Sequence, residues 1–202
     1  MQNEGYALTE NEMINKLRLT QKERRFKHTL GVANEAERLA PKFGVDKDKA
    51  RITALLHDCA KNLDEKSGEE FSKICASYGV TLDDCAKKER ALVHAYLGAA
   101  VAWKDYGIDD PEILDAIYYH TTARANMTAL EKLIYIADMT EPGRELEQSK
   151  EIRRLVEENV EEALIYAIGC SIKHVIKKGT LIHPDSIYAL NYLVEHRREK
   201  SV

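Results

Sequence analysis

The stretch Ala54-Leu55-Leu56-His57-Asp58-Cys59-Ala60-Lys61 places an adjacent histidine and aspartate at the end of an apolar run. Asp46 precedes that run as a candidate helix cap, so we expect the run to be helical with His57 and Asp58 on the helix. Neighbouring helical positions lie about 100° apart around the axis, which lets the two side chains approach one ion from adjacent rows. Lys61 follows one turn later, beside both. This stretch therefore predicts a helical protein with a polar site in its core.

A second polar position on an apolar face lies upstream. His28 stands one turn before Val32 and two turns before Ala36, and Arg25 precedes His28 by one turn. The spacing of three or four residues predicts that all four share one face of a helix. A basic side chain thus accompanies an inward-facing histidine both here and around His57.

Helix signals recur along the whole chain. Side chains of Ser or Thr followed three residues later by Glu form candidate capping boxes at Thr9, Thr20, Ser67 and Thr128. Asp110 before Pro111, and Pro184, mark further starts, whereas predicted stops fall at Gly44, Gly79, Gly107 and Gly179. No alternating strand pattern competes with these signals. The sequence predicts one all-α domain over residues 1–202, a bundle of about eight to ten helices.

Two of three expected apolar stripes contain a polar residue. The stripes are Ile113, Ile117 and His120; Leu130, Ile134 and Asp138; and Ile187, Leu190 and Val194. A carboxylate such as Asp138 on a core-facing stripe is unfavourable unless a charge partner or a metal compensates it. A lone buried histidine is more often bonded to a carbonyl than to a metal, but several such residues favour a shared site.

Composition excludes several classes of protein. The chain has 202 residues with 44% hydrophobic and 32% charged residues, which is typical of a globular protein. Its formal net charge of -4 gives no overall attraction to nucleic acid or to an anionic membrane. No apolar run approaches the roughly 20 residues that span a bilayer, and the start resembles no secretion signal. Four cysteines without a C-x-x-C pair favour free thiols, so we expect a cytoplasmic protein that binds neither nucleic acid nor membrane.

The polar residues on helical faces form an ordered set: His28, His57-Asp58, His94, His120 and Asp138. Histidine nitrogens combined with carboxylates suit iron, manganese or zinc better than calcium. One or two such ions could activate a water molecule as nucleophile, so no catalytic serine or cysteine is required. Arg25, Lys61 and Arg144 would then stabilise the negative charge of a phosphoryl group.

This order resembles the HD-domain phosphohydrolase superfamily, whose metal signature is H…HD…D. The stretches that narrow the resemblance are His28-Thr29-Leu30-Gly31-Val32, Leu56-His57-Asp58-Cys59-Ala60-Lys61, Tyr119-His120-Thr121-Thr122, Ala137-Asp138-Met139-Thr140-Glu141-Pro142-Gly143-Arg144 and Ile182-His183-Pro184. They look like the YqeK family of bacterial HD-domain hydrolases. One departure is Ala123, which follows His120-Thr121-Thr122 where that family usually has glycine.

The resemblance implies symmetrical cleavage of diadenosine tetraphosphate into two ADP molecules at an iron-loaded site. By motif position, the core metal ligands would be His28, His57, Asp58 and Asp138, while His94 and His120 would hold a second metal or contact phosphate. The implied catalytic residues are Asp58, Lys61, His94 and His120. The implied substrate contacts are Arg25, Lys61, His94, His120, Ala137, Arg144, Leu181, Ile182, His183, Pro184, Asp185 and Ser186. The expected metal-site core is residues 20–142, with helices in 149–199 packing on it and contributing to the nucleotide pocket.

Three other functions remain open at this point. The same site could hydrolyse another nucleotide, because a fold and a metal centre do not define a base pocket. A non-catalytic nucleotide-binding module could retain the bundle, although it has no need for the full ligand set. A di-iron oxygenase is the third alternative, because two irons can activate oxygen. The expected partner is a small-molecule dinucleoside polyphosphate or another nucleotide. The sequence is also compatible with a homodimer.

Overall fold

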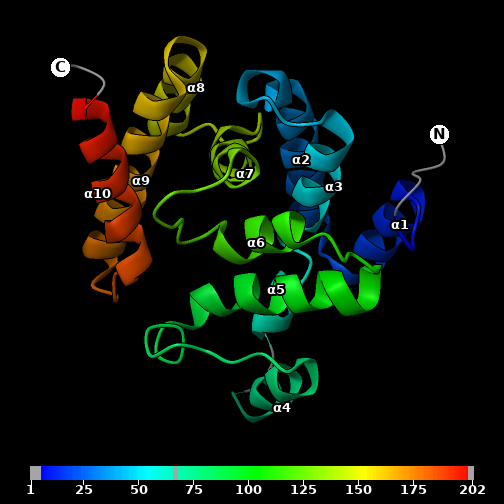
Figure 1. Ribbon diagram of the computed structural model, residues 1–202. Helices are drawn as coiled ribbons and strands as arrows, with labels where there is room; N and C mark the ends of the chain where they lie inside the picture. Colours follow the sequence, from blue (N-terminus) through cyan, green and yellow to red (C-terminus); the bar gives the residue numbers. More distant parts are fainter. Residues whose placement is uncertain (1–5, 66–67, 200–202) are drawn as a thin grey trace.

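The computed structural model describes residues 6–65 and 68–199, and within them the chain forms ten α-helices and one 3₁₀ helix, with no strand. In chain order they are α1 (Glu10–Thr20), α2 (Glu23–Phe43), α3 (Lys47–Leu56), the 3₁₀ helix η1 (Lys61–Glu65), α4 (Gly68–Tyr78), α5 (Arg90–Tyr106), α6 (Pro111–Tyr119), α7 (Ala129–Thr140), α8 (Glu147–Glu158), α9 (Val160–Lys178) and α10 (Pro184–Glu199). In Figure 1, α7 lies between α2 and α3 on one side and α8 to α10 on the other. The predicted all-α fold is confirmed.

Five of the ten described α-helices begin where the sequence predicts: α1, α3, α6, α7 and α10. The side chains of Thr9, Asp46, Asp110 and Thr128 each accept a backbone N–H at the start of α1, α3, α6 and α7 respectively. Each such bond satisfies a donor that the first turn of a helix leaves without an intrahelical partner. Helix starts with a polar cap are therefore readable from sequence in this chain.

The predicted helix start at Thr20 is wrong. Thr20 is the last residue of α1, and its hydroxyl donates to the Lys16 carbonyl oxygen of the same helix at 3.1 Å. The next helix, α2, begins at Glu23 after Lys22. Thr20 and Glu23 match the capping spacing although they belong to different helices. The predicted cap at Ser67 lies outside the described residues.

Four predicted helix ends are confirmed by backbone geometry. Gly44, Gly79, Gly107 and Gly179 have φ angles of 66°, 72°, 69° and 68°. This left-handed conformation costs glycine little, because glycine has no Cβ to clash with its own backbone. The glycines therefore end α2, α4, α5 and α9.

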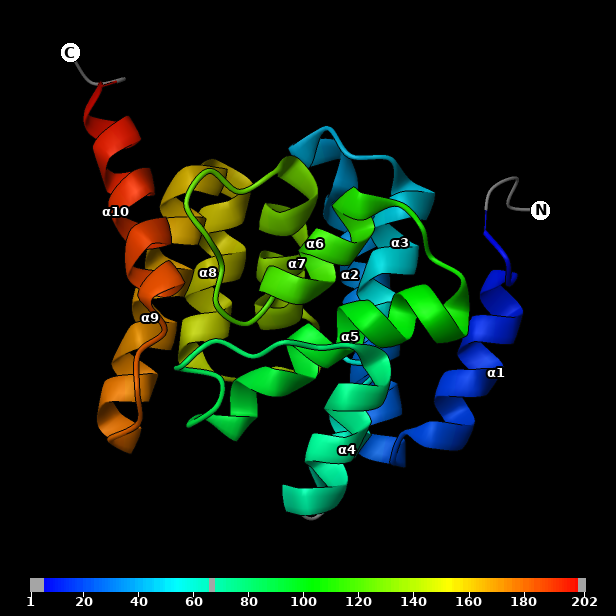
Figure 2. The same cartoon turned by 60° about the horizontal axis from the view of Figure 1, so that its bottom comes forward.

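The helices that carry the ordered polar set pack against one another. α2 packs against α3 and α7, and α6 packs against α3, α5 and α7. The second view of the ribbon shows the same neighbours from another side (Figure 2). The predicted stripes of α6 and α7 are buried, with Ile113, Ile117, Leu130 and Ile134 fully inaccessible. The core of the bundle therefore surrounds the faces on which the polar residues lie.

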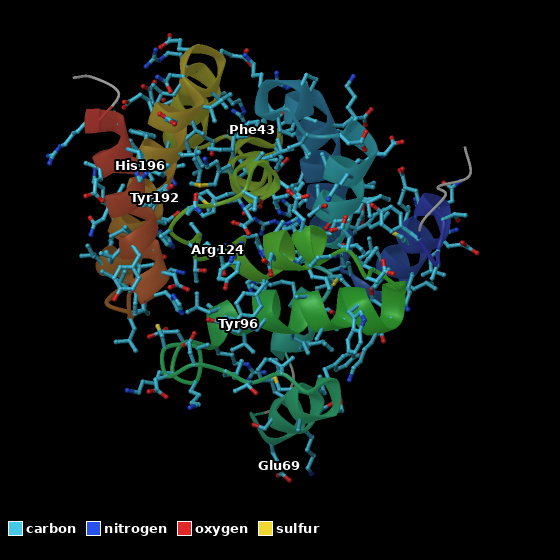
Figure 3. All side chains as sticks on the ribbon, in the orientation of Figure 1. Phe43, Glu69, Tyr96, Arg124, Tyr192 and His196 are labelled. Atoms are coloured by element: carbon cyan, nitrogen blue, oxygen red, sulfur yellow. The ribbon has the colours of Figure 1, made fainter. Side chains whose placement is uncertain are left out.

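The C-terminal helices extend this core outward. α8 packs against α7 and α9, and α10 packs against α9. The predicted stripe on α10 is wrong: Ile187 is 36% exposed, and Ala189 and Leu193 are the buried residues. Figure 3 labels Tyr192 and His196 on α10, and their rings stack with centroids 3.9 Å apart. Among the described helices, none combines the length and the hydropathy needed to cross a bilayer.

Candidate metal centre

Residues far apart in the sequence meet in one cluster between α2, α3, α5, α6 and α7. The cluster contains His28 on α2, His57 and Asp58 after α3, His94 on α5, His120 after α6 and Asp138 on α7. The imidazoles form a row, with ring centroids separated by 5.5 Å for His28 and His57, 5.2 Å for His57 and His120, and 5.1 Å for His94 and His120. The packing of these helices therefore brings the predicted metal ligands together.

His57 and Asp58 lie beyond a helix end, which corrects the expectation that they lie on the helix. α3 ends at Leu56, and the chain continues in tight turns in which the Lys61 N–H donates to the Asp58 carbonyl oxygen at 3.1 Å. His120 likewise follows the last residue of α6. Two of the histidines thus stand at helix C-termini, where carbonyl groups lack intrahelical partners.

Those carbonyl groups fix the proton on each imidazole. Nδ1 of His57 lies 2.6 Å from the Ala54 carbonyl oxygen, and Nδ1 of His120 lies 2.7 Å from that of Ile117. A carbonyl oxygen can only accept, so each Nδ1 carries the hydrogen. Nε2 of each neutral ring is then left with a lone pair, which is the form that binds a metal.

Asp58 is shared by two groups of candidate ligands. The first group is His28, His57 and Asp58, and the second is Asp58, His94 and His120; within each group the ligand atoms lie within 4.8 Å of one another. Oδ2 of Asp58 lies 3.7 Å from Nε2 of His57, whereas Oδ1 lies 3.3 Å from Nε2 of His94. One carboxylate therefore presents a different oxygen to each group, as a residue bridging two ions would.

Asp138 completes the first group. Its Oδ1 lies 3.0 Å from Nε2 of His28, 3.8 Å from Nε2 of His57 and 2.8 Å from Nη2 of Arg144. Burial on its own would raise the pKa of Asp138, but the hydrogen bond from His28 and the charge of Arg144 hold that pKa well below its usual range. Asp138 is therefore a carboxylate at neutral pH.

The Nε2 atom of His57 is the clearest indication of a metal. It is buried and has no hydrogen-bond partner among the residues that the structure describes. Burial lowers the pKa of His57 to about 4, so the ring is neutral at physiological pH. A buried nitrogen without a partner is unfavourable, and a cation between it and the carboxylates of Asp58 and Asp138 would remove that cost. The donor set fits a divalent transition metal.

Lys61 contacts the second group of ligands. Its Nζ lies 2.8 Å from Nδ1 of His94, and Nε2 of His94 lies 3.2 Å from Nε2 of His120. An ammonium group can only donate, so Nδ1 of His94 accepts from Lys61. Burial holds the pKa of His94 well below its usual value. Lys61 is therefore the basic side chain that contacts the second group of ligands.

Two arginines border the first group. Arg25 forms an ion pair with Asp58, and Arg144 forms one with Asp138. Each arginine side chain is 36% exposed, so Arg25 reaches from the solvent-facing rim to the buried Asp58, and Arg144 to the half-buried Asp138. Nε of Arg144 is buried and has no partner within residues 6–65 and 68–199. A donor without an acceptor beside the centre suits an anionic ligand such as phosphate.

Glu141 is a site residue to which the sequence assigned no role. Its Oε1 lies 3.2 Å from Nδ1 of His28, and its side chain is buried. Glu141 follows Asp138 by three residues, a helical spacing that places two side chains on one face and could have indicated it. Its partner His28 is 113 positions away, which local pattern does not reveal.

The segment 181–186 ties the C-terminal helix to the cluster side of the molecule. The Leu181 N–H donates to Glu89 at 2.9 Å, and the Ser186 hydroxyl donates to the Thr122 carbonyl oxygen at 2.7 Å. Thr122 lies two residues after His120. The segment therefore spans from the start of α5 to the turn that carries His120.

His183 is held on both ring nitrogens. Nε2 lies 2.8 Å from Oδ2 of Asp83 and 3.1 Å from the hydroxyl of Tyr96, and Nδ1 accepts from the Asp185 N–H at 3.2 Å. Although burial would raise the pKa of Asp83, the hydrogen bonds from Tyr96, the Ala86 N–H and His183 hold it well below its usual range. Of the other predicted substrate contacts, Ala137 is buried, Ile182 and Asp185 are half-buried, and Leu181 and Pro184 are exposed.

The backbone explains why a glycine is usual at the position of Ala123. Ala123 has φ of 59°, and its N–H donates to the Tyr119 carbonyl oxygen at 2.8 Å, which ends α6 just after His120. In this conformation an alanine is less favourable than a glycine by about 1 kcal/mol. The departure from the family pattern therefore concerns the helix end and removes no polar atom.

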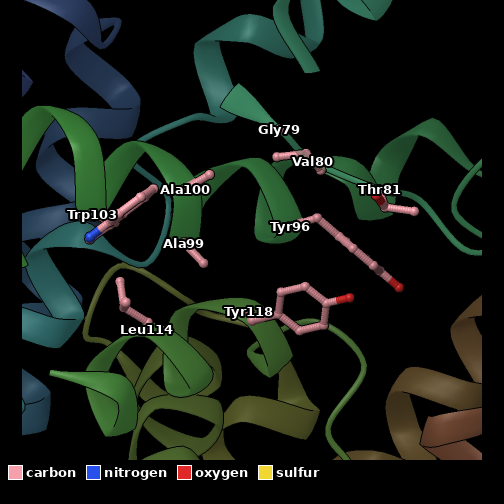
Figure 4. A pocket seen from close by; sticks show the side chains of 9 residues that line it. All are labelled: Gly79, Val80, Thr81, Tyr96, Ala99, Ala100, Trp103, Leu114 and Tyr118. Carbon is pink, nitrogen blue, oxygen red and sulfur yellow. The ribbon is translucent and has the colours of Figure 1, made fainter. Parts of the chain in front are cut away.

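A hollow of about 290 Å³ lies between α5, α6 and residues 79–81 (Figure 4). Its lining consists of Gly79, Val80, Thr81, Tyr96, Ala99, Ala100, Trp103, Leu114 and Tyr118. The rings of Tyr96 and Tyr118 are 4.4 Å apart between centroids, and Figure 4 shows them at one end of the hollow. None of these lining residues belongs to the polar cluster.

Comparisons with known proteins agree with this geometry. The symmetrical bis(5'-nucleosyl)-tetraphosphatase of Bacillus subtilis is 40% identical over 172 residues, which are 85% of this chain and 90% of that protein. The protein of the same name from Halalkalibacterium halodurans is 34% identical over 85% of this chain and 90% of its own length. A solved structure from Clostridium acetobutylicum, described as a predicted HD superfamily hydrolase involved in NAD metabolism, is 42% identical with a TM-score of 0.86 and covers 94% of this chain and 98% of its own.

The HD domain model matches residues 25–143, a range that contains Arg25 and every histidine and carboxylate of the cluster. The relatives align over nearly their full lengths, so the match extends beyond the motif to the C-terminal helices. Since both the cluster and the surrounding bundle agree with it, this chain belongs to the HD domain family.

Proposed function

We propose that this chain is a metal-dependent phosphohydrolase that cleaves diadenosine tetraphosphate symmetrically into two ADP molecules. The observation that carries this proposal is the buried Nε2 of His57, which lies near Asp58 and Asp138 without a hydrogen-bond partner among the described residues. The relatives named symmetrical bis(5'-nucleosyl)-tetraphosphatase support the choice of substrate.

His28, His57, Asp58 and Asp138 would hold the first ion. His94 and His120, together with the second oxygen of Asp58, would hold a second ion or contact phosphate. We propose iron as the metal, because mixed imidazole and carboxylate ligands suit it; manganese and zinc suit the same donors. Such an ion would lower the pKa of a bound water and offset charge on the attacked phosphoryl group.

The side chains around the cluster would orient the polyphosphate. Arg25 and Arg144 border the first ligand group and Lys61 borders the second, so cations lie on both sides of Asp58. Charge on the equatorial oxygens of a phosphoryl group in transfer would be stabilised by these cations. Cleavage of the central anhydride adds the water oxygen to one phosphorus, and the bridging oxygen leaves with the other ADP.

Segment 181–186 is our candidate for the wall of the nucleotide pocket. Ser186 is bonded to the carbonyl group of Thr122, close in sequence to His120, which supports this placement. Four further statements stay predictions: the substrate contacts of Ala137 and of Leu181 to Ser186, the division into core residues 20–142 and C-terminal helices 149–199, a homodimer, and a cytoplasmic location.

The net charge of the chain is -4, and its substrate would be a polyanion. A local concentration of cations at the site would let the chain bind it.

The test is a product analysis with protein purified without oxygen and loaded with iron(II). Diadenosine tetraphosphate should yield two ADP molecules per substrate, resolved by anion-exchange chromatography. ATP, a cyclic dinucleotide and NAD⁺ form the comparison panel, the last because a similar solved structure is described as involved in NAD metabolism. Release of AMP and ATP, faster cleavage of another panel member, or oxygen uptake without phosphate cleavage would contradict the proposal.

Asp58→Asn is the diagnostic variant, because Asp58 alone belongs to both ligand groups. It should lose bound metal and turnover together, whereas a non-catalytic module would show no turnover in either form. Asp115→Asn is a matched control: Asp115 pairs with Arg124 and has a half-exposed side chain. The control should retain both metal and activity.

A further inference from the structure

Glu141 is a buried carboxylate that directly follows the last residue of α7. Glu141 is 6% exposed, and its backbone N–H donates to the Ala137 carbonyl oxygen at 3.0 Å. The side chain crosses to α2, where Oε1 lies 3.2 Å from Nδ1 of His28. Oε2 accepts the Gly143 N–H at 2.6 Å. Each oxygen of this carboxylate therefore has its own hydrogen-bond donor.

His28 needs such a partner because of its place in α2. His57 and His120 stand at helix ends and give their Nδ1 hydrogens to helix carbonyl groups. His28 lies within α2, where the carbonyl groups of the preceding turn bond the helix backbone itself. An acceptor for Nδ1 of His28 must come from another element, and Glu141 supplies it.

Two glycines make room for this carboxylate. A Cβ atom added at Gly31 on α2 would lie 2.8 Å from Oε2 of Glu141, and one added at Gly143 would lie 2.9 Å from the same atom. Both separations are shorter than a carbon and an oxygen tolerate without movement. Gly31 is a helix-interior glycine, where alanine is intrinsically preferred. Its lack of a side chain is explained by the space that Glu141 occupies.

We propose that Glu141 is the positioning residue of the metal centre, acting through His28. Its Oε1 accepts the Nδ1 hydrogen of His28, which orients the ring and directs Nε2 toward Asp138. A negative charge on the far side of an imidazole also raises the basicity of the nitrogen that binds a metal. The inference rests on the metal centre proposed above and adds that Gly31 and Glu141 form one unit with His28.

The first variant is Glu141→Gln, which keeps the shape of the side chain. His28 and Gly143 face different oxygens of Glu141, and glutamine replaces one of these oxygens by an NH2 group, which cannot accept. We expect the affinity of the protein for Mn²⁺, measured by calorimetric titration in competition with a chelator, to fall about 10- to 100-fold. Glu35→Gln is the control, because Glu35 is another buried carboxylate on α2 that pairs with Arg38 instead. Its Mn²⁺ affinity should match that of the wild type.

The second variant is Gly31→Ala, which keeps the negative charge of Glu141 but displaces its carboxylate. It should also weaken Mn²⁺ binding, even though alanine favours the helix. In a Glu141→Ala background, where the carboxylate is absent, Gly31→Ala should cause no further loss. Far-UV circular dichroism and urea unfolding of the metal-free variants separate lost metal binding from lost folding.

The outcomes distinguish this inference from the proposed function. If the wild type binds no Mn²⁺, the metal centre itself is wrong. If the wild type binds Mn²⁺ and folded Glu141→Gln and Gly31→Ala bind it equally well, the role of Glu141 is overturned and the centre stands. If the losses of Mn²⁺ affinity caused by Gly31→Ala and by Glu141→Ala multiply in the double variant, the coupling between Gly31 and Glu141 is also overturned.

Discussion

The histidines around the centre differ in what holds their second nitrogen. His57 and His120 donate to backbone carbonyl groups, His28 to the carboxylate of Glu141, and His94 accepts from Lys61. A backbone carbonyl group is an uncharged acceptor, whereas a carboxylate adds a full negative charge. The ring nitrogens that face Asp58 and Asp138 therefore have different basicity although their residue type is the same.

We expect the protein stripped of metal to lose stability between pH 7 and pH 5. Burial lowers the pKa of His57 to about 4, against 6.5 for an ordinary histidine. Below pH 6.5 the unfolded chain binds a proton that the folded protein does not, so the free energy of unfolding falls as pH falls and levels off near pH 4. At pH 5 this effect of His57 lowers the free energy of unfolding by about 2 kcal/mol relative to its value at high pH.

Urea unfolding in the presence of a chelator measures this dependence. The lowered pKa of Asp138 acts in a separate window, because its contribution is lost only below about pH 4. A His57→Gln variant should show a shallower slope between pH 7 and pH 5. An equal slope in both proteins would assign the pH dependence to other groups.

Arg144→Ala tests the phosphate role of a single cation. The variant removes a guanidinium whose Nε has no partner among the described residues and whose Nη2 contacts Asp138. We expect kcat/KM for diadenosine tetraphosphate to fall about 10²- to 10³-fold, the usual loss for one charge stabiliser. Metal content, measured by elemental analysis, should stay near that of the wild type. Loss of the metal itself would assign Arg144 a structural role at Asp138.

At the scale of elements, α8 holds the end of α7 in place. Arg153 on α8 donates from Nε to the Thr140 carbonyl oxygen at 2.8 Å, and from Nη2 to those of Glu141 at 2.8 Å and Arg144 at 2.7 Å. Carbonyl groups at a helix C-terminus lack intrahelical partners, so the guanidinium of Arg153 binds those of Thr140 and Glu141 at the end of α7 and that of Arg144 in the following turn. The turn that carries Glu141 and Arg144 is thus fixed by a helix outside the cluster.

Arg153→Ala should therefore destabilise the protein and weaken the site together. Loss of three bonds to carbonyl groups is expected to lower the free energy of unfolding by about 2 to 3 kcal/mol in urea titration. Arg153→Lys should restore little, because an ammonium lacks the planar fork that reaches separate acceptors. Arg154, the next residue, forms ion pairs with the partly exposed Glu151 and the exposed Glu158 of the same helix. Arg154→Ala should leave the midpoint of urea unfolding close to that of the wild type, because exposed ion pairs contribute little to stability.

Sequence signals were reliable where a helix boundary depends on one residue. Asp46 and Thr128 cap helices with their own side chains, and Gly107 ends one through its left-handed backbone. Sequence signals failed where a helix boundary depends on contacts with residues distant in the sequence. α3 ends before His57 without a glycine or proline, and Gln21 supports the following turn by donating to the Asp58 carbonyl oxygen.

The site shows the same division between local and distant information. The ordered set from His28 to Asp138 could be proposed from sequence because each member lies at a core-facing position of a short local pattern. The carboxylate of Glu141 and the space at Gly31 could not, because their meeting depends on how α2 packs against α7. Similarly, the hydrogen bonds of His183 with Asp83 and Tyr96 join the residue before α10 to α5 and to the segment before α5.

At the scale of the whole molecule, metal removal should lower thermal stability. A ligand that binds only the folded protein stabilises it by about 2.7 kcal/mol when present at 100 times its dissociation constant. For a chain of this size that corresponds to a fall of about 5 to 10 °C in the unfolding midpoint after chelation. Differential scanning calorimetry with and without Mn²⁺ measures the shift. Asp58→Asn should show no shift, and an equal shift in both proteins would indicate binding elsewhere.

The contact between His28 and Glu141 joins positions 113 residues apart. A chain that is still growing on the ribosome cannot make this contact until α7 and the residue after it have emerged. The imidazole of His28 acquires its acceptor only after the 113 residues that follow it have been made. A metal centre that needs His28 and Glu141 together would therefore form only after α2 to α7 have all been made.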